Sequence, residues 1–193
     1  MKNHITLTDQ QLITLFNDGE AYAMEILVNR HKDRIFTSIY LLVKDKYLAE
    51  DIFQDLFIKI IETFRAGKYK EKNKFVPWAM RIGHNLCVDH FRKLKNKPVI
   101  RTSEGTDIFD ALNFDEPNAE DKIMKLQSSE RIMKLVTQLP EDQREIIILR
   151  HFADLKFREI SKILDCSVNT ALGRMRYALL NLRRLIEEKQ IAL

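Results

Sequence analysis

The sequence has 193 residues, of which 45% are hydrophobic and 31% charged, and its formal net charge is +4. Its five Gly and four Pro residues are too few to supply the turns of a many-stranded sheet, which argues against an all-β fold. The two Cys residues build no disulfide framework and no apolar run approaches the roughly 20 residues of a membrane-spanning helix, so we expect a soluble, cytoplasmic protein.

Helical periodicity runs through most of the first half of the chain. Thr8 and Gln11 form a capping-box pattern that predicts a helix start. The polar run Lys44-Asp45-Lys46 predicts a break, and Pro77 falls in the first turn of a later helix, where proline is tolerated. The predicted helices run from Thr8 to near Gly19, from Glu20 to Val43, from the break at Lys44-Asp45-Lys46 to just before Gly67, and from about Val76 to Leu94.

The third of these helices has the clearest apolar face. That face consists of Ile52, Phe53, Leu56, Phe57, Ile60, Ile61 and Phe64. The opposite face carries Asp51, Gln54, Asp55 and Ile58, at positions i, i+3, i+4 and i+7. An acidic face with an exposed Ile fits a protein groove better than it fits DNA. The simpler alternative is that this face is only exposed to solvent and binds no partner.

The charge distribution divides the chain into three blocks. Residues 1–97 carry a net charge of +5, residues 98–127 carry −4, and residues 128–193 carry +3. The helical pattern fails from Lys95 to about Asn118, where Pro98, Gly105, Pro117 and five acidic residues occur. We therefore predict an all-α protein with two small helical domains, 1–95 and 121–193, joined by a flexible acidic linker at 96–120.

Basic surfaces such as those of the two flanking blocks attract polyanions, nucleic acid first and anionic membranes second. A surface that is merely solvated and solubilising is an equal alternative on charge alone.

The last fifty residues carry the strongest motif. A helix is expected from Pro140 to His151 and a short one from Phe157 to Leu164, and the turn Asp165-Cys166-Ser167 leads into a long helix. Two helices joined by a short turn, with a basic second helix, are typical of a helix-turn-helix domain. Ser167 is a good N-cap, and the chain from Ser167 to Arg184 contains four Arg and no acidic residue.

The long helix has a predictable inner and outer side. Its core side should consist of Val168, Ala171, Met175, Ala178 or Leu179, and Leu182; its outer side should consist of Asn169, Leu172, Gly173, Arg176 and Tyr177. A Gly inside a helix costs about 1 kcal/mol relative to Ala, so Gly173 indicates either close approach to a DNA groove or tight helix packing. Leu172 suits a thymine methyl group, and Arg174 and Arg176 suit phosphates or a guanine edge.

The fourth helix and the loop before it suit unstacked DNA. Arg81, Asn85, Val88 and Arg92 form one stripe of the helix, next to a loop from Lys68 to Lys74. Basic residues follow a phosphate backbone, while rings and amides meet an unstacked base. Trp78 is either a stacking platform or, more commonly for a single Trp at a helix start, part of the core.

These segments resemble bacterial sigma factors of the extracytoplasmic-function (ECF) type. The resemblance lies in Leu139-Pro140-Glu141, Arg144-Glu145, Leu149-Arg150, Glu159-Ile160, Ser167, Thr170 and Arg174, in the segment Ala49-Glu50-Asp51-Ile52-Phe53-Gln54-Asp55, and in the run from Phe75 to Lys93. It covers both helical domains in the right order and leaves only the linker unmatched. A sigma factor directs core RNA polymerase to specific promoters and helps to open their DNA.

The resemblance implies a role for each candidate site residue. Contacts to the minus-35 duplex would come from Ser167, Asn169, Thr170, Leu172, Gly173, Arg174, Arg176 and Tyr177. Contacts to the melted minus-ten element would come from Lys68, Tyr69, Lys70, Lys72, Asn73, Lys74, Trp78, Arg81, Asn85, Arg92 and Lys93. Core polymerase would bind Asp51, Gln54, Asp55 and Ile58. The implied partners are core RNA polymerase, promoter DNA as duplex and as melted strand, and an anti-sigma factor, with no catalytic residue, metal, cofactor or small-molecule substrate.

Four positions depart from the family pattern. Lys156 stands where a capping Ser is usual, so Glu159 lacks its capping-box partner. Asp165 replaces the usual turn Gly, and we expect it at positive φ. Leu172 and Tyr177 replace basic residues, which affects the base preference of the minus-35 contact. By its position between the domains, the acidic linker corresponds to a segment that, in the family, passes through the nucleic-acid channel of the polymerase, and charge mimicry of RNA is a hypothesis.

Three other classes of protein fit the sequence less well. His84, Cys87, Asp89 and His90 lie close in sequence, but His84 and His90 are on different helix faces, so a metal-dependent enzyme is disfavoured. A stand-alone helix-turn-helix regulator of duplex DNA is the main alternative, and it would not need the lysine-rich loop or the acidic face. A purely protein-binding module leaves the acid-free arginine helix unexplained.

Overall fold

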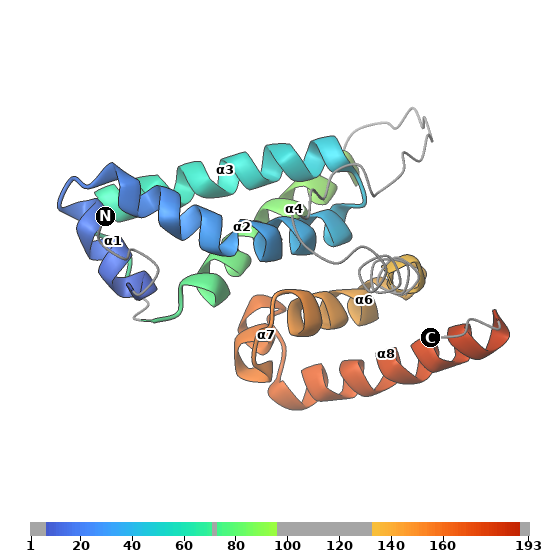
Figure 1. Ribbon diagram of the computed structural model, residues 1–193. Helices are drawn as coiled ribbons and strands as arrows, with labels where there is room; N and C mark the ends of the chain where they lie inside the picture. Colours follow the sequence, from blue (N-terminus) through green and yellow to red (C-terminus); the bar gives the residue numbers. More distant parts are fainter. Residues whose placement is uncertain (1–6, 71–72, 96–132, 190–193) are drawn as a thin grey trace, which may run out of the picture.

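The computed structural model describes residues 7–70, 73–95 and 133–189, and these residues form helices and turns but no strands. In chain order the helices are α1 (Asp9–Asn17), α2 (Ala21–Val43), α3 (Lys46–Arg65), α4 (Phe75–Lys95), α6 (Glu141–Ile147), the π-helix η3 (Ile148–Phe152), α7 (Phe157–Ile163) and α8 (Val168–Glu188). The predicted all-α class is confirmed. Helices α1 to α4 form one layer and α6 to α8 another (Figure 1).

The capping box at Thr8 and the helix break at Lys44-Asp45-Lys46 occur where the sequence predicts them. The Gln11 backbone N–H donates to the Thr8 hydroxyl at 3.3 Å, and the Thr8 backbone N–H donates to Gln11 Oε1 at 2.8 Å, which completes the capping box. Helix α2 ends at Lys44, whose φ of 58° is left-handed. Asp45 then caps α3 by accepting the Leu48 N–H at 2.9 Å.

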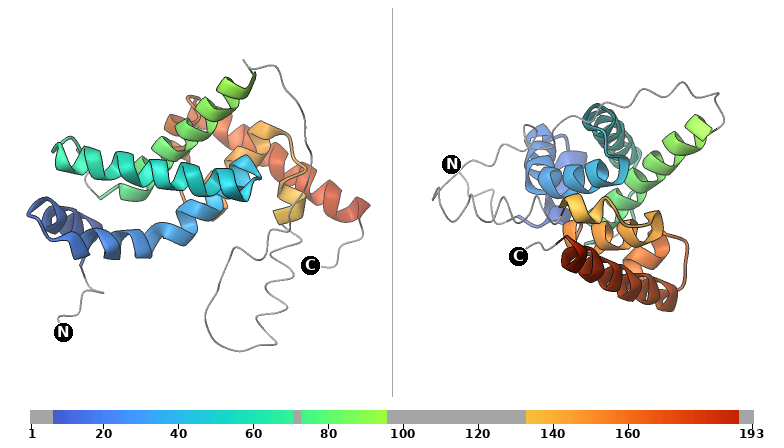
Figure 2. Two further views of the ribbon diagram at one scale, coloured as in Figure 1. Left: turned by 90° about the horizontal axis from the view of Figure 1, so that it is seen from above. Right: turned by 90° about the vertical axis from the view of Figure 1, so that its right-hand side faces the viewer.

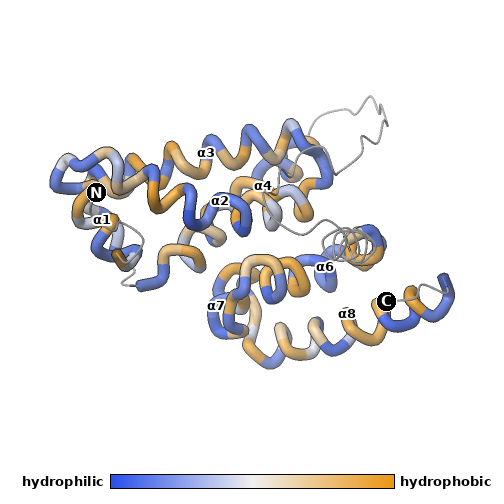
Figure 3. The backbone as a smooth tube through the Cα atoms, in the orientation of Figure 1, coloured by the Kyte–Doolittle hydropathy of each residue, from blue (hydrophilic) through white to orange (hydrophobic). Residues whose placement is uncertain are grey.

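The core of the first domain forms around α3. Of its predicted apolar face, Ile52, Leu56, Phe57, Ile60 and Phe64 are buried, and Phe53 and Ile61 are partly buried. The alternation of hydrophobic and hydrophilic residues along α3 is visible in Figure 3. At the end of α3, the Phe64 ring stacks on Trp78 of α4, with ring centroids 5.7 Å apart. This packing joins α3 and α4 into one apolar layer.

The predicted helix from Pro140 to His151 is two elements, because the chain changes from α6 into the π-helix η3 at Ile148. After η3, the Ala153 N–H donates to Ile148 O and the Leu155 N–H to Leu149 O, both at 3.0 Å. The Arg150 guanidinium donates to Leu155 O at 2.9 Å and holds the turn that precedes α7. Apolar periodicity does not distinguish this turn from a continuous α-helix.

The two domains pack against each other through α4 with α7 and α2 with η3. His84 Nε2 of α4 lies 3.2 Å from Glu145 Oε1 of α6. At another point of the junction, Lys44 Nζ donates to the Thr137 carbonyl at 2.6 Å. Burial, together with the neighbouring positive charge of Arg144, lowers the pKa of Lys44. The described parts of the two domains are therefore in direct contact.

The predicted acidic linker lies outside the described residues. Of the predicted domain boundaries, 95 falls at the end of α4 and 121 lies outside the described residues. Within the described ranges, no helix is both long and apolar enough to cross a membrane.

Candidate nucleic-acid and protein interfaces

The long helix α8 begins with the predicted cap. Ser167 Oγ accepts the Thr170 N–H at 3.0 Å, and the two hydroxyl groups lie 2.8 Å apart. Of its predicted core side, Ala171, Met175 and Ala178 are buried and Leu182 is partly buried. Of the two alternatives Ala178 and Leu179, Ala178 is the core residue, because Leu179 is 49% exposed. The prediction that Val168 faces the core is wrong, because Val168 is 36% exposed.

The outer face of α8 is open. Asn169, Thr170, Leu172, Arg176 and Tyr177 are exposed, whereas Gly173 and Arg174 are partly buried. An ideal Cβ on Gly173 meets no atom within 4 Å, so tight helix packing does not explain this glycine. Arg174 Nε lies 3.9 Å from Asp142 of α6. Arg176 therefore points to solvent, while Arg174 is also held by its own domain.

The turn of the helix-turn-helix has the predicted geometry. Asp165 has a φ of 46°, which confirms the left-handed conformation expected from its place in the turn. Glu159 accepts the Lys156 backbone N–H at 2.8 Å. The ammonium group of Lys156 has no lone pair with which to accept in return, so only one half of the capping box forms.

Around α4, the predicted basic loop is exposed where the structure describes it. Lys68, Lys70, Asn73 and Lys74 are exposed, and Lys72 lies outside the described residues. Tyr69 packs edge-on against Trp78, with centroids 4.7 Å apart, and also against Phe64. Trp78 is only 9% exposed, which favours its core role over an exposed stacking platform.

Most of the predicted stripe of α4 is exposed. Asn85, Val88 and Arg92 are exposed and Arg81 is half-buried, and the candidate Lys93 next to the stripe is exposed as well. Arg92 forms an ion pair with Asp89, three residues earlier on the same helix, at 3.0 Å. Next to the stripe, His84 is buried and contacts Glu145 of the other domain. Helical spacing alone did not reveal this contact, because its two residues are 61 positions apart.

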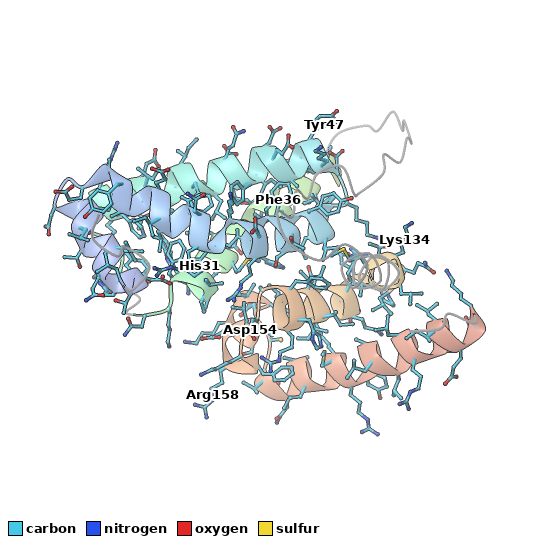
Figure 4. All side chains as sticks on the ribbon, in the orientation of Figure 1. His31, Phe36, Tyr47, Lys134, Asp154 and Arg158 are labelled. Atoms are coloured by element: carbon cyan, nitrogen blue, oxygen red, sulfur yellow. The ribbon has the colours of Figure 1, made fainter. Side chains whose placement is uncertain are left out.

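The acidic face of α3 is exposed as predicted, at Asp51, Gln54, Asp55 and Ile58, and Ile58 is 54% exposed. Tyr47, which was not predicted as a site residue, lies one helical turn before Asp51 and is 73% exposed. Figure 4 shows Tyr47 at the edge of the molecule, where α3 begins. The i, i+4 and i+11 spacing of Tyr47 to Asp51 and Ile58 is the signal that places it on the same face.

The disfavoured metal cluster around α4 gains no support. Burial raises the pKa of the Cys87 thiol to about 12, which opposes the thiolate that a metal requires. The His84 imidazole already contacts the Glu145 carboxylate, with Nε2 and Oε1 3.2 Å apart. Within the described ranges, no three His, Cys, Asp or Glu side chains group together in a way that could hold a metal ion.

Comparison with protein-family models identifies both halves of the chain. The model for Sigma-70 region 2 matches residues 27–97, and the model for Sigma-70, region 4 matches residues 129–182.

Curated relatives match most of the chain. It is 29% identical over 164 residues to the ECF RNA polymerase sigma factor SigW of Bacillus subtilis (strain 168), covering 81% of this chain and 85% of that protein. It is 29% identical over 172 residues to the RNA polymerase sigma-H factor of Pseudomonas aeruginosa, covering 86% and 88% of the two chains. It is 27% identical over 177 residues to the ECF RNA polymerase sigma-E factor of Escherichia coli (strain K12), covering 88% and 89%.

Two solved structures share the fold over both domains. One is CnrH in complex with the cytosolic domain of CnrY, with a TM-score of 0.65 and 20% identity, covering 93% of this chain and 97% of that chain. The other is the sigma factor RpoE in complex with the anti-sigma factor NepR from Bartonella quintana, with a TM-score of 0.61 and 17% identity, covering 85% and 96%.

Proposed function

Because this chain belongs to the ECF-type sigma factors of RNA polymerase, we propose that it directs core RNA polymerase to specific promoters and helps to open their DNA. The observation that carries this proposal is the presence of both sigma regions in one chain, each presenting an exposed helix face of suitable chemistry. Sigma factors are transcription initiation factors, and we assign no catalytic step to this chain.

Helix α8 is the proposed reader of the minus-35 duplex. Its exposed N-terminal half fits a major groove, where side chains reach base edges and the positive end of the helix faces phosphates. Arg176 would contact a phosphate or a guanine, and Leu172 a thymine methyl group. Because Gly173 borders open space, its lack of a side chain would let the helix backbone approach the groove closely. The remaining proposed contacts are Ser167, Asn169, Thr170, Arg174 and Tyr177.

The loop before α4 and the exposed stripe of α4 are the proposed binding surface for the melted minus-ten strand. Lysine ammonium groups on the loop would follow the phosphate backbone, and amide groups would hydrogen-bond an unstacked base. Trp78 contributes through the aromatic packing that positions the start of α4, since its ring is buried. The proposed contact residues are Lys68, Tyr69, Lys70, Lys72, Asn73, Lys74, Arg81, Asn85, Arg92 and Lys93.

The acidic face of α3 is the proposed surface for core polymerase. Exposed Ile58 and Tyr47 give it two apolar anchors among Asp51, Gln54 and Asp55, and protein interfaces commonly combine such anchors with polar surroundings. An anti-sigma factor is a further proposed partner, since the related RpoE was solved with one.

Run-off transcription with core polymerase on a promoter library tests the proposal. We expect product only when this protein and core polymerase are both present. Arg176→Ala should lower the yield from the selected promoters, whereas Arg183→Ala, a matched change farther along the same helix, should leave it close to wild type. A protein that footprints duplex DNA alone but gives no product with core polymerase would instead be a stand-alone regulator.

A further inference from the structure

A cavity of about 250 Å³ lies at the junction of the two domains. Helices α2 and α4 supply part of its wall and α6 supplies the rest. In Figure 1 and in the right-hand view of Figure 2, α6 lies between α2 and α8, on the side of its domain that meets the first domain. At about 30 Å³ for each water molecule, a ligand of about eight to ten non-hydrogen atoms would fill the cavity.

One part of the wall is apolar. It consists of Leu42, Cys87, Val88 and Phe91, of which Leu42 and Cys87 are buried and Phe91 is partly buried. An apolar ligand group placed here would exchange water for carbon and sulfur neighbours, which is favourable in proportion to the apolar area that is buried. The wall therefore favours a ligand with an apolar body over a small inorganic ion.

Another part of the wall carries a guanidinium group with an unused donor. Arg144 Nε is buried, and none of the described residues accepts a hydrogen bond from it. A second cation is close by, since burial and, after it, the charge of Arg144 lower the pKa of Lys44. A buried donor without an acceptor costs free energy, and two neighbouring cations repel each other. A ligand carboxylate would offset both costs, because it accepts from the guanidinium and carries a negative charge.

The glutamates of the wall limit the charge of the ligand. Glu145 lies against His84 at 3.2 Å, and Glu141 is exposed. Both glutamates would repel a group with two negative charges, such as phosphate, more strongly than a carboxylate with one. A ligand ammonium group would be attracted by Glu141 but would leave Arg144 Nε without an acceptor. The lining therefore suits a ligand with a single negative charge.

We propose that this cavity binds a small amphipathic monocarboxylate, with its carboxylate against Arg144 and an apolar body of about six to eight carbon atoms against Leu42, Cys87 and Phe91. The site is independent of the proposed contacts with promoter DNA and polymerase. Because both domains line the cavity, a bound ligand stabilises their contact by mass action. The contact between the domains thereby responds to the concentration of a small carboxylate.

The first experiment is isothermal titration calorimetry of the full chain with phenylacetate. Phenylacetamide has the same shape without the charge, phenethylamine carries the opposite charge, and acetate lacks the apolar body. We expect a dissociation constant of about 0.1 mM for phenylacetate and binding at least about tenfold weaker for the other three compounds. Equal affinity for phenylacetamide or phenethylamine would overturn the carboxylate assignment, and equal affinity for acetate would overturn the role of the apolar wall. Absence of binding by all four compounds would overturn the site.

Variants of Arg144 test its role in the site. Arg144→Met keeps an unbranched side chain but removes the guanidinium group, and it should weaken phenylacetate binding at least about tenfold. Arg144→Lys keeps the charge without the planar fork; it should weaken binding less, and it serves as the milder variant if Arg144→Met does not fold. Arg183→Met, on exposed surface of α8, makes the same change away from the cavity and should bind like the wild type. Circular dichroism establishes that each variant is folded, and wild-type affinity in folded Arg144→Met would overturn the assigned role.

The second experiment locates the ligand by maleimide labelling and mass spectrometry. Cys87 lies in the cavity wall and is 3% exposed, so phenylacetate at ten times its dissociation constant should slow Cys87 labelling about tenfold. Cys166, in the turn before α8, is the internal reference and should react at an unchanged rate. An unchanged rate at Cys87 while phenylacetate is bound would contradict the proposed location. Neither experiment contains DNA or polymerase, whereas failure of the proposed function appears as absence of run-off product.

Discussion

Asp9 of α1 and His31 of α2 lie 2.9 Å apart, between Asp9 Oδ2 and His31 Nε2, and fasten the first helix to the second. Arg30 donates to the other Asp9 carboxylate oxygen at 2.7 Å. Partial burial by itself raises the pKa of Asp9, but the hydrogen bonds from His31 and Arg30 outweigh it and hold the pKa below its ordinary value of 3.8. The carboxylate is thus more stable in the folded protein than in the unfolded chain.

This depressed pKa predicts a pH-dependent effect of Asp9→Asn. The stabilisation is fully present above pH 3.8, the ordinary value, and is lost as the pH falls through the lower folded pKa. We expect the variant to lose about 1 kcal/mol of unfolding free energy at neutral pH and to approach the wild type in strong acid. Urea unfolding across the pH range measures this difference, and a difference that stays constant into strong acid would contradict the prediction.

Gly173→Ala should separate stability from DNA binding. Because an added Cβ meets no atom within 4 Å and Ala is the better helix former, the folded state should gain about 0.5–1 kcal/mol. The same methyl group should weaken binding of the minus-35 duplex, since it would stand between the helix and the groove. Gly83→Ala is the matched control: its Cβ would make ordinary contacts from 3.5 Å, and it should leave duplex affinity unchanged in anisotropy measurements.

Tyr47→Ala should weaken binding to core polymerase. An aromatic side chain at 73% exposure loses little packing when removed from the free protein, whereas loss of an interface anchor typically costs about 2 kcal/mol, or about thirtyfold in affinity. Tyr177→Ala is the reciprocal control, because it should reduce affinity for minus-35 duplex and not for polymerase. Tyr47→Ala with wild-type polymerase affinity would show that the interface ends at Asp51.

Trp78 is the only Trp of the chain, so its fluorescence tests its role directly. With 9% exposure and stacking on Phe64, it should emit at short wavelength and be poorly quenched by iodide. Addition of single-stranded DNA should leave its emission nearly unchanged. Strong quenching by DNA would instead support the stacking role, because a base stacked on the ring alters its fluorescence.

Local signals in the sequence predicted local structure well. The Thr8 capping box, the apolar face of α3 and the left-handed Asp165 each depend on interactions within a few residues, and all three were confirmed. Val168 was misplaced because helical periodicity predicts a face but not how far the core reaches along it, and Val168, the first residue of α8, is 36% exposed.

Long-range contacts were not predictable in the same way. The His84–Glu145 and Arg174–Asp142 pairs join different helices, and the periodicity of one helix gives no partner on another. The turn from α6 into η3 was also missed, since the residues on both sides of Ile148 are equally apolar. The proposed site could be predicted as faces of separate helices, but the contacts of α4 with α7 and of α2 with η3 could not.

Lys44 combines two demands that conflict. Its left-handed backbone, with φ of 58°, costs a residue with a side chain about 1 kcal/mol relative to Gly, yet its ammonium group reaches across to the other domain. Lys44 is therefore locally frustrated: selection for the stability of the first domain alone would favour Gly or Asn at this position. Among close homologues, Lys should persist where the junction matters and drift to Gly or Asn where it does not, so natural variation at this one position records whether the junction is under selection.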